Sequence, residues 1–556
     1  MAEAKQYWMV PRPHRRPHRV PLNLQTFSSV ALGKQWRGNR STQIAFENAL
    51  DNRGLKISGD YSERAVGRGG SGGRTHAALL YALGLYFTYP TETNSDTVFL
   101  TLAGEDLVNH KPALPVLTNQ ILSFQYPSPY SVNRNVNIDR RFKLRPFVFL
   151  LKLLLHPGIN GYLTATEIAT CVLCFAEKHT DKAVSEIAEK ILNFRSEEKV
   201  PSSLAETANL SKSSETIVLQ GQTLGDIADT IMQWLLYTGL VVKDETRTNS
   251  TISSGTTVKL DPSKCDQVRE HIEHFGKLPL MPVFDDQTNK KEKSKALASF
   301  QRTFGRGPFH SRDNRRISEM QASAKQLSDL AIISAAVTTL FPDRLITEPT
   351  EELVTIIHNQ TGQPESFIEA ALIQLFPNKQ KVLSEFLLRY HDMAFSGTDN
   401  AILFEKTTAS IFHDIFGFHT QHVGQQGKKP DVLFSDENFE GIIDTKAYSS
   451  YSLESDHQLR MQTNYIPSTP NAQVFIYIAG GFSPSFGAHL RTIVEATNVH
   501  GCGIGIQALI RLIQGYPSSG RTRSDLVTLW QSDRELTMPD IVSFLDSNNP
   551  SESYVS

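Results

Sequence analysis

Two aspartates and one lysine in the C-terminal third of the chain have the types and the spacing of a metal-dependent hydrolytic site. Asp431 follows a proline and opens the apolar segment DVLF, and Asp444 and Lys446 lie in the segment GIIDTKAY. The turn SDEN lies between the two segments, so antiparallel pairing of two short strands should bring the carboxylates together. Residues two apart on a strand point to the same face, so Asp444 and Lys446 should share one.

The chemistry that fits this group is hydrolysis of a phosphodiester. A carboxylate among apolar strand residues is costly unless it is paired or binds a metal. Two carboxylates and a backbone carbonyl offer the oxygen ligands that Mg²⁺ prefers, and the ion activates water and neutralises phosphate charge. A lysine beside the ion can orient or deprotonate that water and stabilise the transition state. The segments Pro430-Asp431 and Asp444-Thr445-Lys446 thus fit the PD-(D/E)xK arrangement; the alternative is a surface hairpin with a salt bridge.

The surrounding segments predict the elements that would position these residues. A helix with one apolar side begins near Thr398, in the segment TDNAILFEKTTASIFHDIFGF, and a third apolar strand is expected over 474–479. Together with the strand pair they follow the order αβββ. We therefore expect a PD-(D/E)xK nuclease core of the order αβββαβ over residues 391–540, followed by a disordered tail over 541–556.

This region strongly resembles the FokI-like cleavage domains of type IIS restriction endonucleases. The resemblance covers about residues 385–535 and lies in the segments GKKPDVLF, GIIDTKAYSSYSL, DHQLR, VFIYIAGGF and HLRTIVEATNVHGCGIGIQALIRL. It implies that Asp431 and Asp444 bind Mg²⁺ and that Lys446 completes the catalytic site. It also matches Glu405, on the preceding helix, to an acidic position with a supporting catalytic role.

The same resemblance identifies Asp456 and Arg460 as the pair on a dimerisation helix. Residues four apart on a helix share a face. Two such pairs related by a two-fold axis can exchange salt bridges between protomers. The alternative for these two residues alone is an ion pair within one helix.

Residues 1–280 are predicted to recognise DNA through two winged-helix-like subdomains, at about 20–130 and 140–280. In the first, a helix, or a helix and a strand, over 75–86 is followed by the strand segments LYFTYP and TVFLTL around the turn TETNSD, and Thr101 should cap the next helix. In the second, helices precede strands expected at 239–242 and 256–260. Winged helices also serve as protein-interaction modules, so the pattern alone leaves that alternative open.

Basic residues at the start of the chain favour a nucleic-acid partner. Residues 1–75 contain 13 Lys and Arg against 5 Asp and Glu, in a chain whose net charge is −2. The candidates for reading base edges are Arg37, Asn39, Arg40 and Arg74; the alternative for each is a solvated surface side chain. The glycine-rich segment 67–73 is expected to be a flexible loop. It lacks the Lys-Ser/Thr ending of a phosphate-cradling loop, which excludes nucleotide binding there.

Short segments across residues 20–265 are similar to the AlwI type of type IIS restriction enzymes and their strand-nicking relatives. They are LGKQWRGNRSTQIAFENAL, ILSFQYPSPY, LRPFVFLLKLLL, LTATEIA, VSEIAEKILNFR and YTGLVV. This implies recognition of a short asymmetric DNA sequence. The polar and basic composition of residues 281–318, with glycine and proline, and the helical stretch that follows predict a mostly helical linker over 281–390, which would let the nuclease cut at a fixed distance outside that sequence. The expected partners are double-stranded DNA, a second copy in a transient homodimer on DNA, and, functionally, a cognate DNA methyltransferase in the same cell. A strand-specific nicking endonuclease and a non-catalytic DNA-binding regulator are the alternatives.

The length of the chain predicts several domains, and the expected order of helices and strands places them in the α+β and α/β classes. The 556 residues are 40% hydrophobic and 21% charged, which excludes a fibre or a wholly disordered chain. The longest apolar run, 146–155, is broken by Lys152 and is too short to span a bilayer, and no apolar signal segment follows Met1. Four cysteines do not make a disulfide framework. We therefore expect a cytoplasmic protein with no membrane partner.

Overall fold

The computed structural model of the chain forms two compact units, and each is described by itself. Unit 1 comprises Met1–Thr339 and Thr350–Leu375, and unit 2 comprises Leu340–Pro349 and Phe376–Ser556. The structure describes residues 6–11, 17–55, 70–92, 94, 96–132, 138–197, 223–243, 257–261, 264–283, 289–346, 348–377, 379–395, 397, 400–424, 429–437, 439–448 and 450–546.

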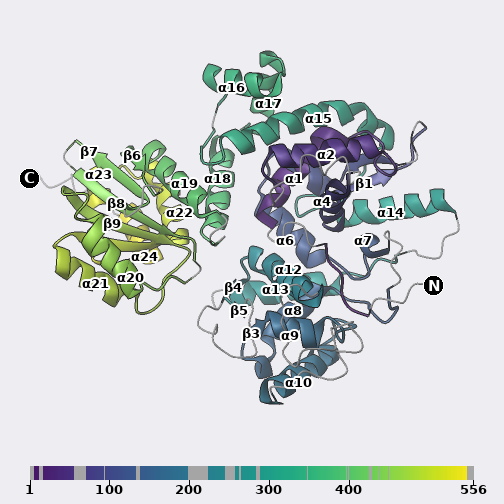
Figure 1. Cartoon of the computed structure of the whole chain (residues 1–556), viewed down its shortest axis with the longest axis horizontal. Helices are drawn as coiled ribbons and strands as arrows, with labels where there is room; N and C mark the ends of the chain where they lie inside the picture. Colours follow the sequence, from purple (N-terminus) through teal and green to yellow (C-terminus); the bar gives the residue numbers. More distant parts are fainter. Residues whose placement is uncertain are drawn as a thin grey trace, which may run out of the picture. The chain divides into compact units, whose positions relative to one another are not determined.

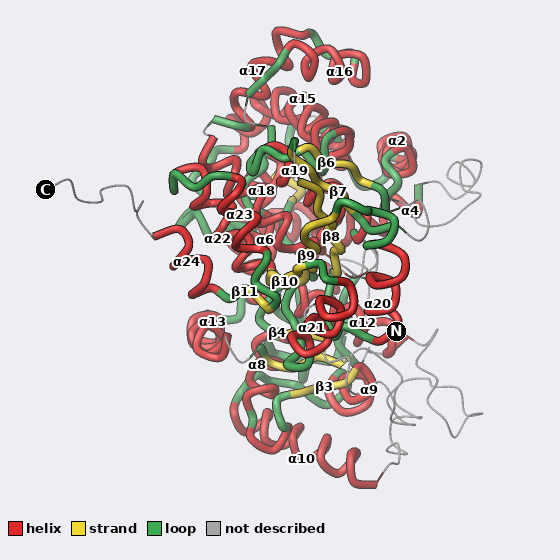
Figure 2. Tube along the Cα trace, turned by 90° about the vertical axis from the view of Figure 1, so that its left-hand side faces the viewer, coloured by secondary structure: helices red, strands yellow, loops and turns green. Residues whose placement is uncertain are grey.

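Unit 2 is built on a mixed six-stranded sheet in the order β11-β10-β9-β8-β7-β6 (Figures 1 and 2). The strands are β6 (His419–His422), β7 (Val432–Asp436), β8 (Phe439–Lys446), β9 (Ala472–Ala479), β10 (His500–Gly505) and β11 (Arg534–Leu536). The pairs β6–β7 and β7–β8 are antiparallel, and the pairs from β8 to β11 are parallel. The β9 sequence AQVFIYIA has a continuous apolar run because helices cover both of its faces.

Two helical layers enclose this sheet. The helices of unit 2 are α18 (Lys379–Met393), α19 (Ala401–Asp414), α20 (Ser455–Arg460), the π-helical turn η7 (Met461–Tyr465), α21 (Phe486–Thr497), α22 (Ile506–Gly515), α23 (Arg523–Trp530) and α24 (Met538–Asp546). Ile442 and Phe475 pack with η7 and α21 on one face. Ile443 and Ile476 pack with α18, α19 and α22 on the other face. Alternate residues of a strand thus serve two cores, which is the period-2 geometry of a strand.

The expected pairing of the strands that carry Asp431 and Lys446 is confirmed. Val432 pairs with Ile443 and Leu433 with Ile442 in an antiparallel ladder. Strand β6 was not expected, because its sequence HTQH carries no apolar alternation. Residues 541–546, expected in a disordered tail, belong to α24 because Ile541 packs into the core; residues 547–556 lie outside the described part of the chain.

Unit 1 is mostly helical around one large core. Its main helices are α1 (Val20–Ala31), α2 (Arg40–Asn52), α4 (Ser71–Ala82), α5 (Leu102–Val108), α6 (Ala113–Ser123), α7 (Pro129–Val132), α8 (Pro146–Leu155), α9 (Ala165–Glu167), α10 (Asp181–Glu197), α12 (Thr223–Tyr237), α13 (Cys265–Lys277), α14 (Lys290–Phe304), α15 (Ile317–Leu340), α16 (Glu351–Thr361) and α17 (Glu365–Leu375). Two small sheets accompany them, β1 (Tyr86–Tyr89) with β2 (Thr97–Leu100), and β3 (Tyr162–Thr164) with β5 (Thr257–Leu260) and β4 (Val241–Lys243).

Both strand pairs expected in unit 1 are present. Strands β1 and β2 are antiparallel, and Thr101 caps α5 by accepting a hydrogen bond of 3.2 Å from the Gly104 N–H. Strands β4 and β5 are also antiparallel, and β3 adds a third strand that was not expected. The winged-helix interpretation of these elements stays a prediction.

The glycine-rich segment is helical where the structure describes it. Residues 67–69 lie outside the described residues, but Ser71 begins α4. A Cβ on Gly73 would lie 2.6 Å from the Gln43 carbonyl oxygen of α2. The expectation of a flexible loop is therefore wrong for residues 71–73, because these glycines allow α4 to pack closely on α2.

The segment expected as a linker, 281–390, is divided between the two units. Within unit 1, Phe300 and Phe304 of α14 and Ala324 of α15 belong to the large core. Amphipathic helices with such anchors pack rather than connect, and this explains why the polar composition alone was misleading. None of the helices in the described ranges is long and apolar enough to cross a membrane.

Candidate active site

The β7–β8 hairpin places the predicted acidic residues opposite each other. Asp431 immediately precedes β7, and the register Val432 to Ile443 continues to Asp431 opposite Asp444. Thr445 fixes this geometry, because its backbone N–H and its hydroxyl donate hydrogen bonds of 2.7 Å and 3.0 Å to Asp431 Oδ2. The hydrogen bond from the Thr445 backbone N–H to Asp431, across the hairpin, thus holds the carboxylates of Asp431 and Asp444 near each other.

Asp444 and Lys446 form a buried ion pair. Lys446 Nζ lies 2.7 Å from Asp444 Oδ2, and the two side chains are 16% and 3% exposed. Within the described residues, no donor reaches Asp444 Oδ1, which is also buried. One oxygen of this carboxylate is therefore engaged by lysine and the other is left for a ligand.

If both aspartates were ionised at once, the site would carry more negative charge than Lys446 balances. Burial and the neighbouring Asp444 raise the pKa of Asp431 above its ordinary value. Burial alone would lower the pKa of Lys446, but Asp444 and Asp431 raise it above the ordinary lysine value, so this side chain stays positively charged. A bound cation would relieve the remaining repulsion between the carboxylates.

A third carboxylate, that of Glu405, lies at the same end of the hairpin. Glu405 stands on α19, and its Oε2 atom lies 2.7 Å from His422 Nε2 on β6. A Cβ on Gly424 would lie 2.5 Å from Glu405 Oε2 and 3.3 Å from Asp431 Oδ1. The space that a side chain at position 424 would fill therefore lies beside both carboxylates.

These residues fit a Mg²⁺ site with few protein ligands. Within the described part of the chain, no three His, Cys, Asp or Glu side chains are arranged as a ready-made metal cage. Mg²⁺ commonly uses one or two carboxylates and takes its other ligands from water and substrate phosphates. The free Oδ1 of Asp444, the opposed Asp431 and the excess of negative charge supply that kind of donor set.

Aromatic residues close the α20–α21 side of the site, and no sequence pattern predicted them. Tyr477 of β9 pairs with Asp444 of β8 in the sheet. Its side chain, including the hydroxyl, is buried. The Tyr451 hydroxyl and His457 Nδ1 lie 2.7 Å apart. Burial raises the pKa of Tyr465, and Asp444 adds to this effect, so Tyr465 lies within the electrostatic reach of the site. Thr445 and His422 were missed as well, because their contacts join residues 14 and 17 positions apart, and Gly424 was missed because it lies against Glu405 of a preceding helix.

The pair predicted on the dimerisation helix is joined within one helix. Arg460 Nη2 lies 2.9 Å from Asp456 Oδ2 on α20, and the side chains are 52% and 72% exposed. Leu459, between them in sequence, is also exposed. The alternative interpretation, an intrahelical pair, thus describes the single chain, and a role in dimerisation stays a prediction.

The residues predicted to contact DNA lie around the start of α2. Asn39 is the N-cap of α2 and accepts a hydrogen bond from the Thr42 N–H. Arg74 of α4 donates a hydrogen bond of 2.9 Å to Gln43 of α2, which brings it to the same region. The Arg37 guanidinium lies 3.8 Å from Asp96, and Arg40 is exposed on the first turn of α2. The structure therefore gathers these four residues, while their contact with DNA stays a prediction.

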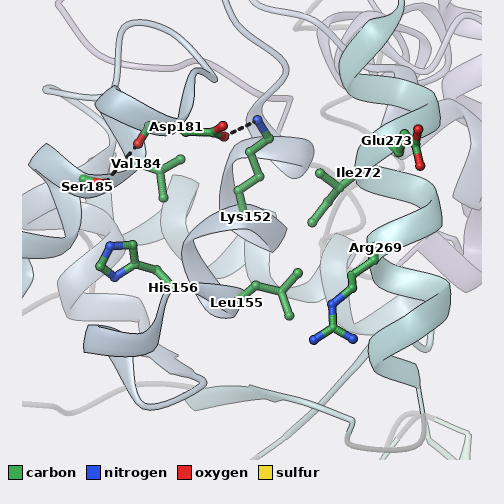
Figure 3. Close-up of a pocket in the computed structure, with 9 residues that line it drawn as sticks. All are labelled: Lys152, Leu155, His156, Asp181, Val184, Ser185, Arg269, Ile272 and Glu273. Carbon is green, nitrogen blue, oxygen red and sulfur yellow. Dashed lines mark hydrogen bonds and ion pairs between the residues drawn. The ribbon is translucent and has the colours of Figure 1, made fainter.

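A pocket of about 420 Å³ lies elsewhere, in unit 1 between α8, α10 and α13 (Figure 3). Its charged residues contact one another or neighbours on the same helix: Lys152 lies 2.7 Å from Asp181, and Arg269 lies 2.9 Å from Asp266. Its floor includes Leu155 and Val184. This pocket lacks the acidic pair, so it is separate from the candidate active site.

The comparisons with known proteins identify the C-terminal segment. Residues 362–537, about a third of the chain, match the sequence model of the FokI cleavage domain. The matched segment contains Asp431, Asp444 and Lys446. This part of the chain is therefore FokI-like, and a cleavage domain of that kind is a nuclease and thus a hydrolase. No curated protein matches the chain.

Two solved structures are similar over most of the chain at low identity. One is of the restriction endonuclease FokI, with 16% identity, coverage of 93% of this chain and 97% of that chain, and a TM-score of 0.29. The other is of FokI bound to DNA, with 17% identity, coverage of 92% and 89%, and a TM-score of 0.28. Scores this low give no basis for transferring an arrangement of the units from FokI.

Proposed function

We propose that this protein is a Mg²⁺-dependent type IIS restriction endonuclease. Unit 1 recognises a short asymmetric sequence in double-stranded DNA, and unit 2 hydrolyses phosphodiester bonds at a fixed distance outside it. The observation that carries the proposal is the opposed pair of Asp431 and Asp444 with Lys446, within the segment that matches the FokI cleavage domain.

Each residue of the site has a definable task. Asp431 and Asp444 would hold Mg²⁺, with Asp431 kept in place by the two hydrogen bonds from Thr445. When bound, the ion would lower the pKa of a water molecule and offset charge on the scissile phosphate. Lys446 keeps its proton beside Asp444, so its ammonium group can orient the attacking water and stabilise the charge that develops on phosphate. Glu405 supports the site from α19.

Cleavage of both strands requires two copies of this site. One site hydrolyses one strand, and the strands of a duplex have opposite polarity. We infer that the protein forms a transient homodimer on DNA through α20, in which Asp456 and Arg460 exchange partners across a two-fold axis. In the cell, a cognate DNA methyltransferase would protect the host sequence.

Strand-specific nicking is the second candidate, and one observation favours it. Asp456 and Arg460 satisfy each other within one helix, so the single chain already provides the ion pair that a dimer would exchange. A non-catalytic regulator is disfavoured, because a buried acidic pair with an adjacent lysine is costly to retain without a ligand.

Cleavage of a supercoiled plasmid tests these candidates together. With Mg²⁺, linear product is expected for the restriction endonuclease, open-circular product for a nicking enzyme, and no product for a regulator. EDTA should abolish either product. Asp414→Asn, at the exposed end of α19, is a control that should leave cleavage unchanged. Activity that persists in EDTA would contradict the metal-dependent mechanism.

A further inference from the structure

His422 and Glu405 form a mostly enclosed contact between α19 and β6. The distance between His422 Nε2 and Glu405 Oε2 is 2.7 Å, and the side chains are 19% and 14% exposed. This contact uses Oε2, the same carboxylate oxygen that lies beside Gly424 next to Asp431. Histidine in its Nε2–H form would donate to Glu405 and fix the direction of the carboxylate.

The end of β6 is also attached to Asp431. The N–H groups of Val423 and Gly424 donate hydrogen bonds of 2.9 Å and 3.1 Å to the Asp431 carbonyl oxygen. A side chain at position 424 would meet Glu405 Oε2 at 2.5 Å and Asp431 Oδ1 at 3.3 Å. Glycine at this position therefore lets the two carboxylates approach the same stretch of backbone.

A purely structural cross-link does not explain this arrangement. A contact that only fastened α19 to β6 would be more stable away from a second and a third carboxylate, because like charges repel. Here the cross-link instead brings Glu405 to the aspartate pair, where its charge adds to that of Asp431. A group that is held against repulsion in this way is explained by a positive ligand.

We propose that His422 and Gly424 position the carboxylate of Glu405 beside Asp431, so that Glu405 adds a third acidic charge near the divalent cation without completing a cage of protein ligands around it. His422 is a positioning residue, since it acts through Glu405. Partners of this kind, one step away from a metal, typically change metal affinity by about 10- to 100-fold when they are removed. The inference rests on the proposed function, because it assumes that Asp431 and Asp444 bind a divalent cation.

Binding of Mn²⁺ to the full chain without DNA, followed by electron paramagnetic resonance, tests the inference independently of cleavage. The ions lost in Asp444→Asn define the site. We expect His422→Leu, Glu405→Gln and Gly424→Ala each to weaken Mn²⁺ binding at that site by about tenfold or more. His422→Gln retains an N–H donor and should recover part of the affinity. His419→Gln, at an exposed position of the same strand, and Gly487→Ala, with open space around it, are the matched controls.

The outcomes separate the two proposals. Unchanged Mn²⁺ affinity in His422→Leu and Glu405→Gln, with site binding lost in Asp444→Asn, would overturn the positioning role and leave the proposed function standing. Mn²⁺ binding that survives in Asp444→Asn and Asp431→Asn would overturn the metal site itself. A lower melting temperature for His422→Leu with normal Mn²⁺ affinity of the folded protein would show a structural cross-link only and would also overturn the inference.

Discussion

Thr445, the middle residue of the Asp-Thr-Lys segment, illustrates what single residues contribute to the site. Its neighbours Asp444 and Lys446 share one face of β8, while its own N–H and hydroxyl hold Asp431 across the hairpin. The role of the flanking residues follows from a spacing of two. The role of Thr445 follows from the register of β7 against β8. The sequence alone does not determine which residue of one strand lies opposite which residue of the other.

Removal of any of the three central side chains should abolish cleavage and leave DNA binding intact. Asp431→Ala and Asp444→Ala each remove a carboxylate from the cation, and Lys446→Ala removes the ammonium group beside the phosphate. Each loss should lower the single-turnover rate by roughly 10³-fold or more, because it removes several kcal/mol of transition-state stabilisation. Rapid-quench cleavage assays and gel-shift titrations would measure the two effects separately. Full cleavage by Asp444→Ala with Mg²⁺ would refute the assignment.

Asn39 can be tested for DNA recognition without disturbing the helix that it caps. Asn39→Ser keeps an N-cap oxygen for the Thr42 N–H and removes the amide that could bind a base edge. If Asn39 reads a base, discrimination between specific and scrambled duplexes should fall by about 1–3 kcal/mol at an unchanged melting temperature. Competition binding would measure this difference. Unchanged discrimination would leave Asn39 with a capping role alone.

At the scale of elements, the connection between α14 and α15 depends on one buried carboxylate. The Asp313 side chain is 4% exposed, and Arg302 Nε and Arg315 Nη2 lie 3.0 Å and 2.8 Å from its Oδ2 atom. Burial alone would raise the pKa of Asp313, but the hydrogen bonds from both arginines lower it well below the ordinary range. The carboxylate therefore stabilises the fold in its ionised form.

Asp313→Asn should weaken this part of unit 1 most at neutral pH, and by less as the pH falls below the unfolded-state pKa. A carboxyl whose pKa is lowered by folding stabilises the protein above its unfolded-state pKa of about 3.9, and this stabilisation is lost as the pH falls through the folded-state value. Breaking a buried pair costs about 3–5 kcal/mol, which sets the upper limit at pH 7. Hydrogen–deuterium exchange of α14 peptides, variant against wild type at pH 7 and pH 3, measures the difference. Equal protection at pH 7 would show that the arginines do not depend on this charge.

Helix α20 offers a test of dimerisation. Arg460→Asp should leave DNA binding intact, slow double-strand cutting and let nicked circles accumulate, because it places like charges across the two-fold axis. Asp456→Arg combined with Arg460→Asp restores opposite signs and should recover part of the rate, although an exposed pair is worth about 1 kcal/mol or less. The wild-type rate should rise faster than linearly with protein concentration. A linear dependence, with normal double-strand cutting by Arg460→Asp, would exclude α20 as the dimer face.

The elements that the sequence predicted best are those with a strong local signal. The β7–β8 hairpin has apolar strands around a polar turn, and α19 has an apolar side, so both were expected. Strand β6 has a polar sequence and forms because its backbone hydrogen-bonds to the edge of β7. Helix α4 begins within glycines because α2 packs against them. Tertiary contacts decide such elements, and no pattern within the segment reports them.

At the scale of the whole molecule, the two units divide recognition from chemistry in the proposed function. The acidic pair, Lys446 and Glu405 all lie in unit 2, whereas Arg37, Asn39, Arg40 and Arg74 all lie in unit 1. The segment that matches the FokI cleavage domain begins at residue 362, within unit 1, so sequence similarity and compactness do not divide the chain at the same residue. Helices α16 and α17 thus belong by packing to unit 1, although α17 lies within the matched segment.

Separation of the units should therefore separate specificity from hydrolysis. Residues 376–556 contain the complete sheet and its two helical layers, and this fragment should cut DNA slowly and without sequence preference.

The full chain carrying Asp444→Asn should still bind its specific duplex, with an affinity that falls steeply as salt rises, because basic side chains release phosphate counterions. Arg40→Ala and Arg74→Ala should each reduce that salt dependence by about one counterion if they contact phosphates. Run-off sequencing of the cleaved ends measures the specificity of the fragment, and titrations between 50 and 200 mM salt, roughly the range over which such binding changes most, measure the electrostatic part. Sequence-specific ends from the isolated fragment would mean that unit 2 itself reads DNA, and the division of labour between the units would then be wrong.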